Sequence, residues 1–182
     1  MCGFFGLQSY SLDKHKKISA SKKAIDLLNS RGPDSNGIVL DDNDNLIFAH
    51  NRLSILDLSE TGNQPMISSS GNLLMIFNGE IYNHKSLREE LINNHNFKNW
   101  KGSSDSETLI QSVEIWGIEK TLKKLNGMFA FIIWDRTSKT LFLARDRFGE
   151  KPLYYGWISQ IDSFVFSSDL IFDKIFKNVD FS

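Results

Sequence analysis

Runs of apolar residues separated by short polar segments dominate the chain and predict strands. Strands are expected over residues 2–7, 37–40, 46–49, 73–77, 128–134, 141–145, 153–157 and 164–167. Residues 129–134 are apolar without interruption, which favours a strand covered on both faces of its sheet. The run at 73–77 is followed by Asn78-Gly79, a common turn pair, so we expect that strand to end there.

Three segments have the features of helices. Residues 15–29 carry apolar side chains at helical spacing and stop before the helix-breaking segment 31–34. Two further helices are marked by a serine followed three residues later by a glutamate, the spacing of a capping box. These pairs are Ser86 with Glu89, before a helix to about residue 94, and Ser104 with Glu107, before a helix through Trp116. Strands and helices in blocks indicate an α+β protein with layered sheets and helices outside.

Composition excludes several classes of protein. The chain has 182 residues, of which 41% are hydrophobic and 24% charged, and no repeat or linker divides it, so we expect one domain over residues 1–182. The formal net charge of −1 gives no electrostatic reason to expect a nucleic-acid or anionic-membrane partner. One cysteine excludes an internal disulfide and a cysteine-rich metal site. The sequence has no signal peptide and no apolar stretch of about 20 residues, so we expect a cytoplasmic protein.

The single cysteine, Cys2, directly follows Met1. We expect Met1 to be removed, because cysteine is small, and removal leaves a thiol and a free α-amine on one residue. An α-amine with a pKa near ~8 can accept the thiol proton at neutral pH, so Cys2 can be both nucleophile and base. A lone cysteine is also commonly a small buried residue at the start of a strand, and Cys2 alone does not distinguish the two.

Six further segments mix Gly, Asn, Asp and Arg in a way that a hydrophobic core does not require. They span residues 31–37, 49–57, 77–83, 104–107, 125–131 and 144–155. Together with Cys2-Gly3, they resemble the glutaminase (class II glutamine amidotransferase) domain of glutamine-dependent asparagine synthetases, in the same order and over residues 2 to about 169. The resemblance implies an N-terminal-nucleophile hydrolase fold, a four-layer αββα sandwich of two mainly antiparallel sheets.

The resemblance implies catalytic roles for three residues. Cys2 attacks the side-chain amide carbon of glutamine, and its own α-amine handles the proton. The side-chain amide of Asn78 and the backbone N–H of Gly79 form the oxyanion hole for the tetrahedral intermediate. Without the resemblance, Asn78-Gly79 is equally well interpreted as an ordinary turn.

The resemblance also implies five substrate-binding residues. Arg52 pairs with the carboxylate of free glutamine through its planar guanidinium, and Asp105 pairs with the substrate ammonium. Leu53, Ile55 and Glu80 line the pocket. The alternatives are a surface salt bridge for Arg52, a helix-terminal charge for Asp105 and a solvated loop residue for Glu80.

Two of the segments and the histidines are given structural roles. Residues 31–34 are expected to end a helix, and residues 146–149 to connect two strands and fix charge pairs near the core. The four histidines show no metal-ligand spacing, and His50 is expected to steady the loop that carries Arg52.

The resemblance finally suggests partners and cofactors. The synthetase domain of the family, which uses ATP and Mg²⁺ to activate aspartate, carries a Ser-Gly-Gly-Xaa-Asp-Ser loop that this chain lacks. We therefore expect this chain to be a glutaminase domain that holds no metal or cofactor. In the full-length protein we expect a C-terminal synthetase domain, absent from this sequence, to follow in the same chain, and the protein to be able to form a homodimer. Two alternatives stay open: the same chemistry serving a sugar or natural-product amidotransferase, and a non-catalytic regulatory domain.

Overall fold

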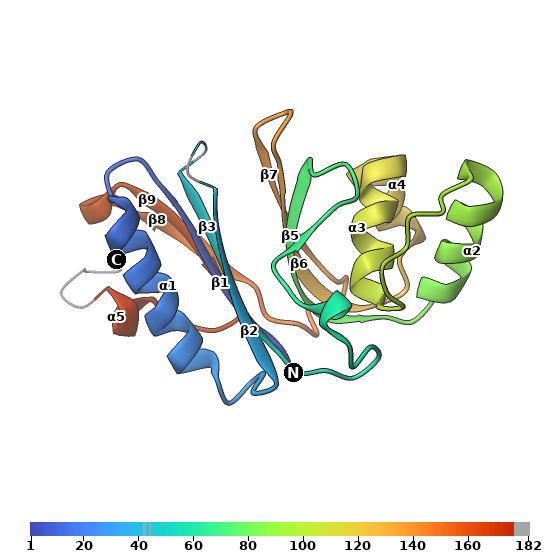
Figure 1. Ribbon diagram of the computed structural model, residues 1–182. Coiled ribbons are helices and arrows are strands. Elements are labelled where there is room, and N and C mark those ends of the chain that lie inside the picture. The colour runs from blue at the N-terminus through green and yellow to red at the C-terminus, as the bar shows by residue number, and fades with distance from the viewer. Residues whose placement is uncertain (42, 44, 177–182) are drawn as a thin grey trace.

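The computed structural model describes residues 1–41, 43 and 45–176, and its strands form two sheets (Figure 1). The first sheet has the order β2 (Ser35–Asp41), β3 (Leu46–Arg52), β1 (Gly3–Ser9), β9 (Ser163–Ser167) and β8 (Tyr154–Ile158). The second has the order β4 (Met66–Ile67), β5 (Leu73–Ile81), β6 (Gly127–Asp135) and β7 (Thr140–Arg145). Each strand pair in both sheets is antiparallel.

Helices cover the outer face of each sheet, so the molecule has four layers (Figure 1). Helices α1 (Lys14–Leu28) and α5 (Phe172–Ile175) pack on the first sheet, where Ala24, Leu28 and Ile175 join its core. On the second sheet lie α3 (Asp105–Trp116) and α4 (Ile118–Lys124), and α2 (His84–His95) packs against α3. A third apolar cluster fills the space between the sheets, drawing on both. The predicted α+β sandwich is confirmed, including the strand at 129–134 that is buried on both faces.

Helix starts follow the predicted capping only in part. The hydroxyl of Ser104 accepts the Glu107 N–H and begins α3 as expected, although the Glu107 carboxylate binds the backbone at 101 and 102 instead of closing the box. The helix predicted to start at about Ser86 is present as α2 but begins at His84, so the prediction that Ser86 caps it is wrong. Its N-cap, Asn83, directs its side chain to the backbone of the 124–126 segment, so a tertiary contact decides where the helix begins.

Strand β5 continues beyond its predicted end. Asn78 and Gly79 lie within the strand, opposite Ala130 and Phe129 of β6, so the predicted end of the strand is wrong and the alternative of an ordinary turn does not apply. A Cβ on Gly79 would collide with the backbone of Met128 and Phe129, which shows that glycine serves close strand approach here. The short elements β4, α4 and α5 were not predicted, and residues 42 and 44, in the segment between the strands predicted at 37–40 and 46–49, lie outside the described residues.

Candidate active site

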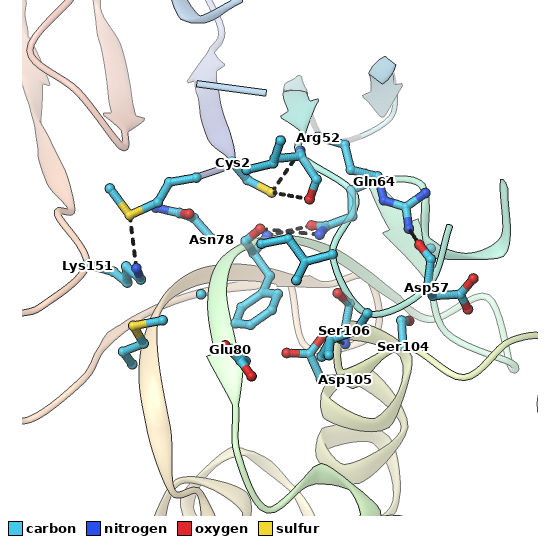
Figure 2. A pocket seen from close by; sticks show the side chains of 18 residues that line it. Cys2, Arg52, Asp57, Gln64, Asn78, Glu80, Ser104, Asp105, Ser106 and Lys151 are labelled. Carbon is cyan, nitrogen blue, oxygen red and sulfur yellow. Dashed lines mark hydrogen bonds between the residues drawn. The ribbon is translucent and has the colours of Figure 1, made fainter. Parts of the chain in front are cut away.

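All eight predicted site residues line one cavity at the edge of the two sheets (Figure 2). They come from the residue before β1, the end of β3 and the loop after it, the second half of β5 and the start of α3. They are Cys2, Arg52, Leu53, Ile55, Asn78, Gly79, Glu80 and Asp105. The fold therefore brings together residues that are up to 103 positions apart in the sequence, counted from Cys2 to Asp105.

Cys2 is partly buried and held from two sides. Its Sγ accepts the Leu53 N–H at 3.4 Å and donates to the Leu53 carbonyl at 3.7 Å, and Arg31 Nε donates to the Cys2 carbonyl at 3.2 Å. Burial raises the pKa of the Cys2 thiol, although the hydrogen bond from Leu53 acts in the opposite direction. A thiol that stays protonated at neutral pH needs a base before it can act as a nucleophile.

Asn78 faces the space between the sheets and is almost fully buried. Its Nδ2 has no hydrogen-bond partner among the described residues. Asn78 lines the same cavity as Cys2, so this donor is available to a group bound there. Figure 2 shows the two side chains on adjacent walls of the cavity.

The backbone N–H of Gly79 points to the open edge of β5. Its partner across the ladder, Phe129, uses both backbone groups on Asp146: the N–H donates to Oδ2 at 3.2 Å, and the carbonyl accepts the Asp146 N–H at 2.8 Å. Facing residues of an antiparallel pair either exchange hydrogen bonds or both point away. The Gly79 N–H therefore points away from β6, toward the side of β5 where the cavity lies.

Arg52 is buried at the end of β3, and most of its guanidinium is engaged by the loop that follows. Nη1 donates to the Ser59 carbonyl at 2.7 Å and to Asn63 Oδ1 at 3.0 Å, and Nη2 donates to the Asp57 carbonyl. A guanidinium has five N–H donors, so these contacts leave two for a carboxylate. A surface salt bridge does not describe Arg52, which binds neutral oxygens and shapes the cavity wall.

Asp105 is the first residue of α3 and is buried. Its carboxylate accepts the Ile81 N–H and the Ser106 N–H, both at 2.9 Å. Burial raises the pKa of Asp105, so this carboxyl takes up a proton at a higher pH than an ordinary aspartate. Asp105 thus ties the end of β5 to α3, while Glu80, on the same strand, is only partly exposed at the cavity wall.

Asp57 connects the two segments that carry Arg52 and Asp105, and the sequence did not suggest this role. Its carboxylate accepts the Ser59 N–H at 2.9 Å on one side and the Ser103 N–H at 2.9 Å on the other. The Ser59 hydroxyl also donates to this carboxylate, at 2.6 Å, and this hydrogen bond first, together with the two backbone ones, holds the pKa of Asp57 well below its usual range. The only hint in the sequence is that Asp57 ends one of the polar segments.

Two segments assigned to structure have more specific contacts than expected. Arg31 contacts Cys2 directly, and Asp34 accepts the Ser54 N–H at 2.7 Å, so residues 31–34 support the cavity as well as ending α1. The Asp146 carboxylate accepts backbone N–H groups rather than forming a charge pair with any described residue. The cavity is also lined by Met1, Gln64, Phe77, Met128 and Lys151, which the sequence did not single out as site residues.

Among the described residues, no three His, Cys, Asp or Glu side chains gather closely enough to bind a metal ion. None of the helices in the described part of the chain combines the length and apolar character that crossing a bilayer requires.

Comparison with known proteins identifies the family. A family model described as a glutamine amidotransferase domain matches residues 1–179. The chain belongs to this family. It is 39% identical over 176 residues to the glutamine-hydrolyzing asparagine synthetase 1 of Bacillus subtilis strain 168, which covers 93% of this chain and 26% of that protein. The resemblance inferred from the polar segments is confirmed.

Relatives with other names match as well. The chain is 36% identical over 143 residues to amidase chry2 of Gibberella zeae, covering 79% of this chain and 21% of that protein. It is 39% identical over 138 residues to amidase chyE of Penicillium rubens, covering 76% of this chain and 20% of that protein. The chain spans between 20% and 34% of the length of eight curated relatives that it matches, these three included.

Proposed function

We propose that this glutamine amidotransferase domain hydrolyses glutamine to glutamate and ammonia through a thioester on Cys2. One observation carries the proposal: the Cys2 thiol shares a cavity with the buried Nδ2 of Asn78, which has no hydrogen-bond partner in the described part of the chain. An unsatisfied buried donor costs about 1–3 kcal/mol, so its presence beside a nucleophile supports a role in binding a developing oxyanion.

The proposed reaction begins with attack of Sγ on the side-chain amide carbon of glutamine, while the thiol proton passes to the α-amine of Cys2. The carbonyl oxygen becomes an oxyanion that accepts from Asn78 Nδ2 and the Gly79 N–H. Collapse breaks the carbon–nitrogen bond, and the protonated amine gives its proton to the departing ammonia. Water then attacks the thioester, which releases glutamate and restores the thiol.

The proposal requires that Met1 be removed. With Met1 attached, the Cys2 nitrogen belongs to a peptide bond and cannot accept a proton. Met1 also lines the cavity, where its Sδ lies 2.9 Å from Lys151 Nζ. Removal of Met1 therefore creates the base and clears part of the cavity in one step.

The charged ends of free glutamine are assigned to Arg52 and Asp105. The two N–H groups of Arg52 that the loop leaves unused suit the α-carboxylate, and the buried Asp105 carboxylate suits the ammonium. Leu53 and Ile55, in the loop after β3, and Glu80, on β5, complete the walls. Exclusion of water from these groups strengthens each interaction with the substrate.

We propose further that the ammonia serves asparagine synthesis from aspartate by an ATP- and Mg²⁺-dependent domain of a longer protein. The support is the identity with proteins named asparagine synthetases over 93% of this chain. The similarity to proteins named amidases favours, as a second candidate, the same glutaminase chemistry with another acceptor.

The test is an intact mass spectrum after incubation with 6-diazo-5-oxo-norleucine, an electrophilic glutamine analogue, together with an assay for glutamate release. We expect a chain lacking Met1 to gain one adduct on Cys2, to be protected by glutamine, and to release glutamate. The Cys2→Ala variant should show neither. A trimmed chain that forms no adduct and releases no glutamate would refute the proposed function.

A further inference from the structure

We propose that Gln64 and His50 are positioning residues that brace the Phe77–Asn78 peptide and so hold the oxyanion donors in place. This inference rests on the proposed glutaminase function. Both side chains are buried, and both bind the backbone of Phe77, the residue before Asn78. Among the described residues, no hydrogen bond joins either side chain to Cys2, Asn78 or Gly79, the residues to which catalysis is assigned.

Gln64 takes the place of a missing strand. Strand β4 is only two residues long, and its register with β5, continued backward, places Gln64 opposite Phe77. The side-chain amide of Gln64 pairs there as a peptide would: Oε1 accepts the Phe77 N–H at 2.6 Å, and Nε2 donates to the Phe77 carbonyl at 3.2 Å (Figure 2). The neighbouring Pro65 has no N–H with which to continue the ladder.

His50 braces the same carbonyl from the other sheet. His50 lies on β3, opposite Phe4 of β1, and Phe4 is two residues after the nucleophile Cys2. The Nε2 atom of His50 lies 3.0 Å from the Phe77 carbonyl oxygen. A carbonyl can only accept, so Nε2 carries the proton in this contact. The predicted role of steadying the Arg52 loop is wrong, because His50 links the nucleophile's sheet to β5.

The two contacts hold the carbonyl of the peptide that leads from the core of β5 to the oxyanion hole, while the N–H of that peptide, that of Asn78, faces Ala130 of β6. Rotation of the Phe77–Asn78 peptide would move the Asn78 side chain and the Gly79 N–H together. An oxyanion donor acts mainly in the transition state, so a displaced donor lowers kcat more than it changes KM. Gln64 and His50 thereby set the spacing between Cys2 Sγ and its oxyanion donors.

The test compares Gln64→Met, which keeps the length of the side chain and removes both hydrogen bonds, with His50→Leu, which removes the N–H donor to the Phe77 carbonyl. The matched control is Gln111→Met, because Gln111 is also a buried glutamine and lies on α3 against Ser69, away from the cavity. Steady-state kinetics of glutamine hydrolysis give kcat and KM. The ¹⁵N signal of the Asn78 side chain, assigned with Asn78→Ala, and the hydrogen-exchange protection of the Phe77 amide need no turnover.

We expect Gln64→Met and His50→Leu each to lower kcat by about 10- to 100-fold with KM within about twofold, while Gln111→Met stays near the wild type. The Asn78 signal should shift in both Gln64→Met and His50→Leu, and Phe77 protection should fall most in Gln64→Met, which removes the acceptor of that amide. Equal losses in Gln64→Met and Gln111→Met, or an unmoved Asn78 signal, would overturn the brace. A wild-type domain without glutaminase activity would refute the proposed function instead, and the two spectroscopic readouts would still decide on the brace.

Discussion

The buried imidazole of His50 should make folding stability depend on pH in a way that one substitution removes. Burial lowers the pKa of His50 from 6.5 to about 4, the Phe77 carbonyl opposes the change, and the nearby charge of Arg52 adds to it. In the unfolded chain the same group keeps a pKa near ~6.5. Between pH 6.5 and pH 4 the unfolded state therefore binds a proton that the folded state does not.

The sign and the size of the effect follow from this difference. Stability is fully present above about pH 6.5 and is lost as the pH falls toward 4, below which both states are protonated. The loss amounts to about 3 kcal/mol between pH 7 and pH 4, of which about 2 kcal/mol is lost by pH 5. His50→Gln keeps a donor for the Phe77 carbonyl but cannot titrate, so its stability should lack this contribution.

The assay is urea unfolding of the wild type and His50→Gln at pH 7, 6 and 5, followed by circular dichroism. Carboxylates titrate in both proteins, so the difference in unfolding free energy isolates His50. From pH 7 to pH 5, the unfolding free energy of the wild type should fall by about 2 kcal/mol more than that of His50→Gln. His15→Gln, on the exposed face of α1, is the control substitution. A difference that stays constant across the range would refute the neutral buried imidazole.

Four further predictions concern the cavity. Asn78→Ala should lower kcat for glutamine hydrolysis by about 10²- to 10³-fold with little change in KM, because it removes one oxyanion donor; steady-state kinetics check this. As the pH is lowered from 7, the KM for glutamine should begin to rise at a higher pH than an ordinary aspartate would cause, because burial raises the pKa of Asp105 and protonation removes its charge, whereas Asp105→Asn should have a high KM that is independent of pH. Asp57→Ala should lower kcat/KM by about 10- to 100-fold, mainly through KM, because it releases the loops that carry Arg52 and Asp105; a normal KM would contradict this role. A variant with two glycines inserted after Met1 should neither release glutamate nor form a thioester, as judged by mass spectrometry, because Cys2 then lacks its free amine.

The sequence predicted those elements whose signals are local. Apolar runs marked the strands, and helical spacing marked α1, because burial of these faces is repeated along the segment itself. The end of β5 was predicted wrongly because Asn78-Gly79 has the chemistry of a turn. Its pairing with β6 and the close approach of Met128 and Phe129 outweigh that local preference.

The site shows the same division. The resemblance led to eight residues that line one cavity, yet it did not suggest Asp57, Gln64 or the contact made by His50. Each of these three acts through a hydrogen bond to backbone that is distant in the sequence. No spacing or periodicity encodes such a contact, because it depends on how the sheets and loops come together.

The open edge of β5 explains why the cavity lies where it does. A longer β4 would pair with β5 as far as Gly79 and would consume the N–H proposed for the oxyanion hole. Strand β4 instead begins only at Met66, directly after Pro65, which has no N–H to donate to a ladder. A free edge would leave the Phe77 backbone groups buried and unpaired, at a cost of about 1–3 kcal/mol for each group. The side chain of Gln64 pairs with these groups. The edge of β5 is therefore closed at Phe77 and left open at Gly79, two residues further along the strand.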